Sequence, residues 1–414
     1  MPAPQNPALR RTLGRDTSGL ILVFCFAVLS VTIVFYSRLT LLIMPPTASL
    51  GLLIFTCGTA VACTLLSEGI RFGAPFIYIT ELLIMSIVSA FLFQIQFGFE
   101  NDFRVAFSVS GIISYFLILF SCRKIGYHNT LFMVIIVLSI YVFVYDLISF
   151  MVVFMKGFLD APSRSLILND PFRGRRVYFL ASTGALLLFG SLIDWRPRLT
   201  PVVVLPVLAA AAFLISQSRV PIAIMILLLS LRWLRADRLL AAGLLLVPVT
   251  IVVTGLSVPV VAPQISQLLS KGDWPTMDLR IETLTVAGHL FSEYPILGTG
   301  TAADFSNLRS ILNADLYPED LGVVGLMSSG GVVWLLIFTV SVATCVAIAR
   351  SFLLSGRAGD RELGYAAAFL ALFSMTTTVI LTGDGAMILG ILWALSTARQ
   401  GEGAGRAHEV SVRG

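Results

Sequence analysis

Charged residues are rare in this chain. Asp, Glu, Lys and Arg together make up 12% of the 414 residues, whereas hydrophobic residues make up 57%. The mean hydropathy is +0.92, which is far above the range of soluble globular domains. These values exclude a soluble enzyme and predict a polytopic membrane protein.

Histidine and cysteine are also scarce. Two of the three histidines fall in segments assigned below to the cytoplasm, so a histidine metal site is not expected. The five cysteines lie in apolar runs or at their cytoplasmic edge and lack zinc-site spacing, so they predict no disulfide framework and no metal site. The net charge of +5 needs no nucleic-acid partner, because basic inward-facing membrane loops account for it. No cofactor is expected.

Long apolar runs dominate the chain instead. Runs of roughly 17–25 residues are long enough to cross the hydrocarbon layer as helices, and helices satisfy their own backbone in lipid. We therefore predict an all-α fold with about 12 transmembrane helices. The predicted spans are 18–36, 48–66, 76–94, 104–121, 131–155, 177–193, 200–216, 220–234, 239–258, 322–345, 364–382 and 385–398.

The distribution of basic residues orients these spans. With the N-terminus inside, more than half of the 28 Lys and Arg residues fall on the cytoplasmic side, as the positive-inside rule requires. The predicted organisation is a cytoplasmic segment at 1–17, nine helices within 18–258, a large periplasmic loop at 259–321, three helices within 322–398, and a cytoplasmic tail at 399–414. We expect the tail to be a disordered end.

One loop on the outer side is unusually basic. Between Met155 and Val177 it contains Lys156, Arg164, Arg173, Arg175 and Arg176, although short outer loops are normally poor in Lys and Arg. These cations suggest an anionic ligand. The alternative is that Arg173, Arg175 and Arg176 anchor the following span at the lipid headgroups.

The large loop contains a predicted helix from Met277 to Glu293. Its polar stripe is Asp278, Glu282, Thr285, His289 and Glu293, and its apolar stripe is Ile281, Leu284, Gly288 and Phe291. Arg280 falls on the apolar side. Pro295 ends the helix, and Gly298-Thr299-Gly300-Thr301 then forms a flexible turn whose amides could form an anion-binding nest.

The order of these features resembles the signature loop of the O-antigen ligase and polymerase superfamily. The resemblance rests on Arg280, the helix, Tyr294-Pro295-Ile296-Leu297-Gly298-Thr299-Gly300, Glu319-Asp320, and a span containing Gly330-Gly331. Ser216-Gln217-Ser218-Arg219 is similar to the family's Ser-Arg hairpin, and Arg173 with Gly184 is similar to an Arg-x10-Gly element of the polymerases. The resemblance implies a bacterial inner-membrane glycosyltransferase whose active site faces the periplasm.

The resemblance also implies the substrate and the site. The donor would be an undecaprenyl-diphosphate-linked oligosaccharide, and the further partners would be membrane lipids, a chain-length regulator and a flippase. Guanidinium groups bind phosphate oxygens in pairs, so the expected diphosphate-binding residues are Arg173, Arg175, Arg176, Arg219 and Arg280, with Gly298 and Gly300. The expected general base is Asp320 or Glu319, followed by His289. The scheme requires no metal.

The identity of the base separates the two branches of the family. Ligases carry a His just before the span that follows the large loop, and this chain has Glu319 and Asp320 there. This favours a repeat-unit polymerase over an O-antigen ligase. A secondary transporter is a second alternative, but it would require more intramembrane charge near mid-bilayer. A non-enzymatic membrane scaffold would need neither Arg280 nor the acidic pair.

Each of these residues also has a structural alternative. Arg219 could extend to the headgroup region, Arg280 could pair with a neighbouring acid, and His289 could be an ordinary surface residue. Asp320 could be the N-cap of the next span. Two further carboxylates, Glu81 and Asp146, lie within predicted spans, where such groups are either functional or paired.

Overall fold

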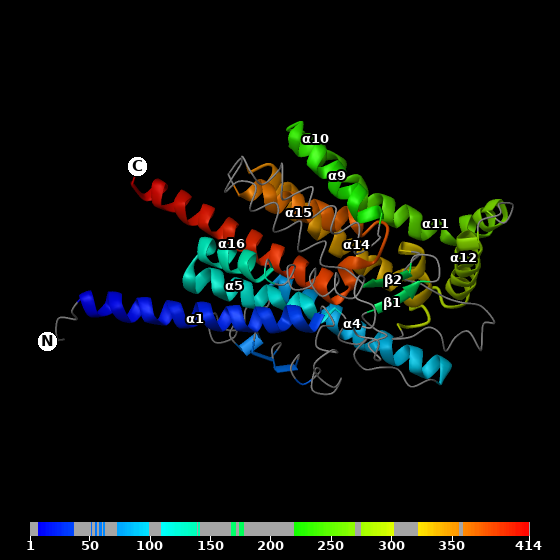
Figure 1. Cartoon of the computed structure of the whole chain (residues 1–414), viewed down its shortest axis with the longest axis horizontal. Helices are drawn as coiled ribbons and strands as arrows, with labels where there is room; N and C mark the ends of the chain where they lie inside the picture. The colour runs from blue at the N-terminus through cyan, green and yellow to red at the C-terminus, as the bar shows by residue number, and fades with distance from the viewer. Residues whose placement is uncertain are drawn as a thin grey trace. The chain divides into compact units, whose positions relative to one another are not determined.

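The computed structural model describes residues 7–36, 73–98, 109–138, 167–170, 174–177, 219–269, 275–301, 322–355 and 359–413, with isolated positions at 51, 54–55, 58–59, 61–62 and 140. The described residues are almost entirely helical (Figure 1). Three helices are long and apolar enough to cross a membrane: Ala74–Phe97, Asp237–Ser257 and Val323–Leu353. This finding agrees with the predicted membrane protein, although about 12 spans were expected.

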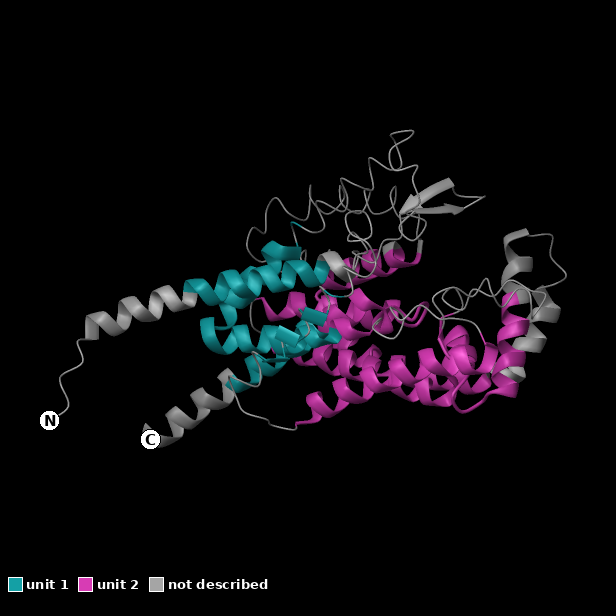
Figure 2. Cartoon of the chain, turned by 90° about the horizontal axis from the view of Figure 1, so that it is seen from below, with its two compact units in different colours: residues 1–71, 112–217, 390–414 teal, residues 72–111, 218–389 magenta. Residues whose placement is uncertain are grey.

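The chain divides into two compact units (Figure 2). Unit 1 comprises residues 1–71, 112–217 and 390–414, and unit 2 comprises residues 72–111 and 218–389. The candidate spans Ala74–Phe97, Asp237–Ser257 and Val323–Leu353 all belong to unit 2.

Unit 1 contains α1 (Pro7–Tyr36), α5 (Ser114–Ile125) and most of α16 (Gly383–Arg413), and α1 packs against α5. The Tyr115 and Trp393 rings lie 5.3 Å apart, which joins α5 to α16. Position 390 is a glycine because an added Cβ would lie 2.7 Å from the Ile112 carbonyl oxygen and from Ser114 Oγ.

Unit 1 differs from the prediction in two places. Strands β1 (Ile167–Asp170) and β2 (Gly174–Val177) form an antiparallel hairpin, a local exception among described residues that are otherwise helical, as predicted. The hairpin is consistent with its sequence, in which two short strand segments flank Pro171, a residue typical of turns. The tail expected to be disordered continues α16 to Arg413, because no proline interrupts it and Ala, Arg and Glu favour helix.

Unit 2 contains α4 (Ala74–Phe97), α9 (Arg219–Trp233), α10 (Asp237–Gly243), α11 (Leu246–Leu269) and α12 (Pro275–Glu293). It also contains α14 (Val323–Leu353), α15 (Asp360–Phe373) and the short 3-10 helix η6 (Val379–Leu381). Helix α14 packs against α11, α12 and α15, and it runs beside α15 in Figure 1. Helix α14 is therefore the centre of this unit.

Local sequence explains the bounds of α4. Pro75 lies in the first turn, where its missing N–H costs nothing. Gly98 ends the helix with φ of 68°, and its amide donates to the Gln94 carbonyl at 2.9 Å. The predicted span was 76–94. The helix is therefore where the apolar run predicted it, and it is longer by two residues at its start and three at its end.

Two predicted spans in unit 2 have different outcomes. The span expected at 239–258 agrees with the candidate span Asp237–Ser257, although α11 itself continues past Pro259 to Leu269. The span 364–382 is not one helix, because α15 ends at Phe373. After Phe373 the Met375 and Thr376 amides donate to carbonyls three residues back, those of Leu372 and Phe373, both at 3.1 Å, so the chain leaves the α-helical ladder there.

Candidate active site

The glycine-rich loop that follows α12 is built into the interior of unit 2. Gly298, Thr299 and Gly300 are buried, whereas Ile296 and Leu297 are exposed. Tyr294 begins the loop, and its carbonyl accepts the Gly298 amide at 3.0 Å. Desolvation and the adjacent Glu293 carboxylate raise the pKa of the Tyr294 phenol, so at neutral pH this group is a hydrogen-bond donor.

Helix α14 is broken where the loop meets it. Gly331 has φ of 60° and ψ of −160°, which is not helical. The amides of Val332 and Val333 therefore do not follow the helical ladder. Val332 N–H donates to the Pro295 carbonyl at 2.9 Å, and Val333 N–H donates to the Ile296 carbonyl at 3.2 Å. Two loop carbonyls thus replace two helix carbonyls.

The helix carbonyls released by this break are satisfied by the same loop. In a continuous helix Ser328 and Ser329 would accept from the residues four positions later. Here the Ser328 carbonyl accepts the Thr299 amide at 3.1 Å, and the Ser329 carbonyl accepts the Gly300 amide at 2.8 Å. We call this exchange of four backbone bonds the loop–helix splice. A broken span is tolerated at membrane depth when its backbone groups are satisfied within the protein.

Glycine is required at the closest points of the splice. A Cβ on Gly331 would lie 2.4 Å from the Ile296 carbonyl oxygen, and one on Gly300 would lie 2.4 Å from the Phe93 amide nitrogen. Both glycines also have positive φ, 60° and 85°, which residues with side chains rarely adopt. The glycines expected to bind an anion therefore have a clear packing role.

Helix α4 lies along the other side of the loop. The Ser89 carbonyl accepts the Thr301 amide at 3.2 Å, and Gln96 Nε2 donates to the Gly298 carbonyl at 3.5 Å. Ser89 Oγ, Gln96 Oε1 and Trp334 Nε1 are buried without a hydrogen-bond partner among the described residues. The interior around the loop is therefore polar, although α4 and α14 are both candidate membrane spans.

The expected anion-binding nest is not formed by this loop. The amides of Gly298, Thr299, Gly300 and Thr301 all donate to backbone carbonyls. An N–H group used in this way is not free to bind phosphate. Gly298 and Gly300 thus shape the loop and anchor it to α14 and α4, and a bound diphosphate would depend on side chains.

Helix α12 agrees with its prediction in extent and in part in orientation. It was expected at 277–293 and runs from Pro275 to Glu293. Thr285, His289 and Glu293 are exposed, as the polar stripe predicted, so His289 lies on the surface of the unit. Among the described side chains, Thr283, Ala287, Leu290 and Phe291 are buried, whereas Leu284 and Gly288 of the predicted apolar stripe are only half-buried. By helical register, position 280 falls on the face of Ala287 and Phe291.

The other predicted site residues are placed only in part. Arg173, Glu319 and Asp320 lie outside the described residues. Arg219 is the first residue of α9, and Arg280 lies in α12. Both belong to unit 2, together with positions 319 and 320.

The cationic loop belongs to the other unit. Arg175 and Arg176 lie in β2, in register with Asn169 and Leu168, and position 173 is also in unit 1.

The segment that carries the predicted base is fixed at both ends in unit 2. Thr301 is bonded to α4 before it, and Gly322 opens α14 after it. Gly322 has φ of 55°, and a Cβ there would lie 2.9 Å from the Thr376 carbonyl oxygen. Position 320 is therefore two residues from a tightly packed point of the backbone.

Sequence reasoning did not identify the helix side of the splice. Gly330 and Gly331 were noted only as part of a family pattern, and Ser328 and Ser329 were not considered. The available signal was two adjacent glycines inside a long apolar run, which often indicate a close backbone approach.

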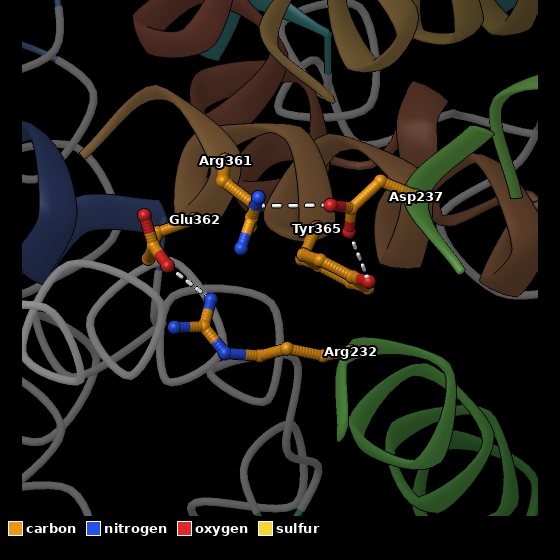
Figure 3. A network of polar contacts seen from close by, with 5 residues as sticks. All are labelled: Arg232, Asp237, Arg361, Glu362 and Tyr365. Atoms are coloured by element: carbon orange, nitrogen blue, oxygen red, sulfur yellow. Dashed lines mark hydrogen bonds and ion pairs between the residues drawn. The ribbon is translucent and has the colours of Figure 1, made fainter. Parts of the chain in front are cut away.

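A second polar cluster, also unforeseen, joins α9, α10 and α15 (Figure 3). Arg232 forms an ion pair with Glu362, which is fully buried. Arg361 Nε lies 3.0 Å from Asp237 Oδ2, and Tyr365 donates its phenolic hydrogen to Asp237 Oδ1 at 2.7 Å. The predicted topology places these ends of α9, α10 and α15 on the cytoplasmic side. It places the end of α4 and the loop after α12, which the contact between Gln96 and Gly298 joins, on the outer side.

Comparison with known families identifies the region that contains the loop. Residues 203–321 match the family model for O-antigen ligase. The resemblance inferred from the motifs is thus confirmed for this region. A search of curated proteins found no match to the chain. The O-antigen ligase match contains α9 to α12 and the spliced loop, and it ends one residue before Gly322. The splice therefore joins the matched domain to α14, which follows it.

The match indicates a membrane enzyme that transfers glycans from lipid-linked substrates. It applies to ligases and polymerases alike.

Proposed function

We propose that this protein is a polysaccharide repeat-unit polymerase of the bacterial inner membrane. It would transfer a growing glycan from undecaprenyl diphosphate to the next lipid-linked repeat unit, on the periplasmic side. The observation that carries the proposal is the acidic pair Glu319-Asp320, at the end of the O-antigen ligase match, where ligases have a histidine.

The proposed reaction needs three groups of residues. An acceptor hydroxyl attacks the anomeric carbon of the donor, and the bond from that carbon to the diphosphate oxygen breaks with its electron pair on the oxygen. Asp320, or Glu319 in its place, takes the proton of the hydroxyl as the new C–O bond forms. Arg219 and Arg280 stabilise the charge that develops on the leaving diphosphate.

The arrangement of unit 2 supports this assignment. Arg280 belongs to α12, which packs against α14 and leads directly into the spliced loop. The segment with Asp320 leaves the splice at Thr301 and returns to α14 at Gly322. Both chain segments are thus tied to α14, which would give an arginine and a carboxylate a common rigid support.

Arg173, Arg175 and Arg176 would have a different role. Arg175 and Arg176 lie in β2, and position 173 belongs to the same unit; we propose that these cations attract the anionic lipid-linked substrate. His289 is exposed on the polar face of α12, so it remains a candidate base only if both acids prove dispensable.

Asp320→Asn tests the proposed function directly. The amide keeps the shape and the capping ability of Asp but removes its basicity. We expect purified Asp320→Asn protein to bind lipid-linked repeat units and to form no polymer. Glu319→Gln makes the same change at the alternative base one residue away, so loss of polymer in only one of the two variants identifies the base. Near-normal polymerisation by both variants would place the base elsewhere.

The glycan produced in cells separates polymerase from ligase. A deletion strain should lose long chains while one repeat unit stays attached to its carrier, and wild-type protein should restore the ladder. Loss of all attached glycan would instead identify an O-antigen ligase.

A further inference from the structure

The turn between α9 and α10 exposes apolar and basic side chains together. Trp233 is 86% exposed, Leu234 67% and Leu239 68%. Arg235 and Arg238 are exposed beside them. We call these five residues the 233–239 patch.

The backbone of this turn is fixed. Arg235 has φ of 54°, an uncommon conformation for a residue with a side chain. Its amide donates to the Arg232 carbonyl at 3.0 Å, and the Ala236 amide donates to the Leu231 carbonyl at 2.9 Å. This is the Schellman pattern that ends many helices. The patch is therefore presented by a defined turn.

The neighbouring acidic groups are turned inward and neutralised. Asp237 is held by Arg361 and Tyr365, and Glu362 is held by Arg232 (Figure 3). Arg235 and Arg238 have no ion pair among the described residues. The exposed charge of the turn is therefore positive.

The turn lies at a membrane boundary. The candidate span Asp237–Ser257 begins here, and the apolar helix Ala223–Trp233 ends here. The charge distribution of the chain assigns this boundary to the cytoplasmic side. Tryptophan concentrates at such boundaries because its ring is amphipathic, and anionic lipids of the cytoplasmic leaflet attract Lys and Arg.

We propose that the 233–239 patch binds the headgroup of an anionic phospholipid. Arg235 and Arg238 contact the lipid phosphate, and Trp233 and Leu234 enter the boundary between headgroups and acyl chains. Charge complementarity selects this occupant, and the apolar residues favour a membrane lipid over a soluble anion. Each arginine should contribute about fivefold to the preference for anionic over zwitterionic lipid.

Quenching of Trp233 by brominated lipid tests the proposal. The full-length protein is reconstituted in vesicles of mixed phosphatidylglycerol and phosphatidylcholine in which one lipid or the other is brominated, at equal bromine content. Subtracting the signal of a Trp233→Phe variant isolates the quenching at this residue. We expect phosphatidylglycerol to compete for the site several-fold more effectively than phosphatidylcholine. The preference should fall as salt is raised, because salt screens exposed charges.

Charge-neutral variants complete the test. Arg235→Gln with Arg238→Gln should abolish the preference at Trp233. The matched control is Arg123→Gln with Lys124→Gln, which removes two exposed cations at the end of α5 and should leave the preference unchanged. Equal quenching by both lipids in the wild-type protein would overturn the proposal. So would an equal loss in both double variants.

Discussion

Replacing Gly331 with alanine should open the loop–helix splice. Gly331 is where α14 leaves the helical path, and the Ile296 carbonyl lies against it. An alanine Cβ would be 2.4 Å from the Ile296 oxygen and 2.7 Å from the Gly298 nitrogen. These are backbone atoms, so no side-chain rotation can relieve the contact.

The expected cost follows from the bonds of the splice. Keeping the native backbone at position 331 would cost on the order of 1–3 kcal/mol in strain, in addition to the steric contact. Releasing the loop would break the four backbone hydrogen bonds of the splice. Helix α14 could re-form two of them as a continuous helix, so the net loss is two hydrogen bonds at about 1 kcal/mol each. The loop groups that lose their partners add a desolvation cost. We therefore expect the splice to lose about 2–4 kcal/mol.

Hydrogen exchange measured by mass spectrometry would detect this loss. Peptides that cover 295–301 and 328–333 should exchange roughly 30- to 900-fold faster in Gly331→Ala, while peptides from α15 stay protected. Gly98→Ala is the control for strain alone, because Gly98 has φ of 68° and no atom within 4 Å of an added Cβ. Gly243→Ala controls for the substitution itself, because its Cβ would also meet nothing. Unchanged protection of the two splice peptides would refute the reasoning.

Three further predictions concern the remaining charged groups. Arg219→Lys and Arg280→Lys should each reduce polymer formation severely at normal protein level, because lysine keeps the charge but loses the paired hydrogen bonds; full activity would show a structural role. Arg175→Gln should raise the apparent KM for lipid-linked substrate more at low salt than at high salt, because salt screens an attracting charge; an effect on turnover alone would contradict this role. Glu362→Gln should destabilise the protein by about 3–5 kcal/mol, because it leaves Arg232 in a partly buried position without its carboxylate. Adding Arg232→Met should recover much of that loss in thermal unfolding, and additive effects of the two changes would show that the residues are not coupled.

Long periodic segments were predictable from the sequence. The span expected at 220–234 is α9 at Arg219–Trp233, and the helix expected at 277–293 is α12 at Pro275–Glu293. In both cases the apolar pattern persists over several turns, so the helix follows from local residues. The pattern oriented the polar face of α12 correctly, because His289 is exposed, but of its described apolar stripe only Phe291 is buried.

The errors in unit 2 concern the positions at which two helices end. Pro259 was expected to open the large loop, but α11 continues past it to Leu269. Ser374 and Thr376 were placed within a span, although α15 ends at Phe373 and the Met375 and Thr376 amides bond three residues back.

The loop–helix splice could not be predicted from local sequence patterns. It joins residues about thirty positions apart, such as Thr299 and Ser328, and no periodic pattern records such a pairing. The loop was therefore expected to offer its amides to a ligand, whereas two of them complete a broken helix. Gly298 and Gly300 were expected to bind an anion, and their backbone contacts with α14 and α4 were not expected.

The splice also bears on how the protein is made. The loop precedes α14 in the chain, so Pro295 to Thr301 have already been synthesised when Gly331 emerges. Helix α14 can enter the membrane as a continuous helix, with its own carbonyls bonded, and exchange those bonds for the loop only afterwards. The step needs no unsatisfied backbone group in lipid, because each bond given up within the helix has a replacement in the adjacent loop.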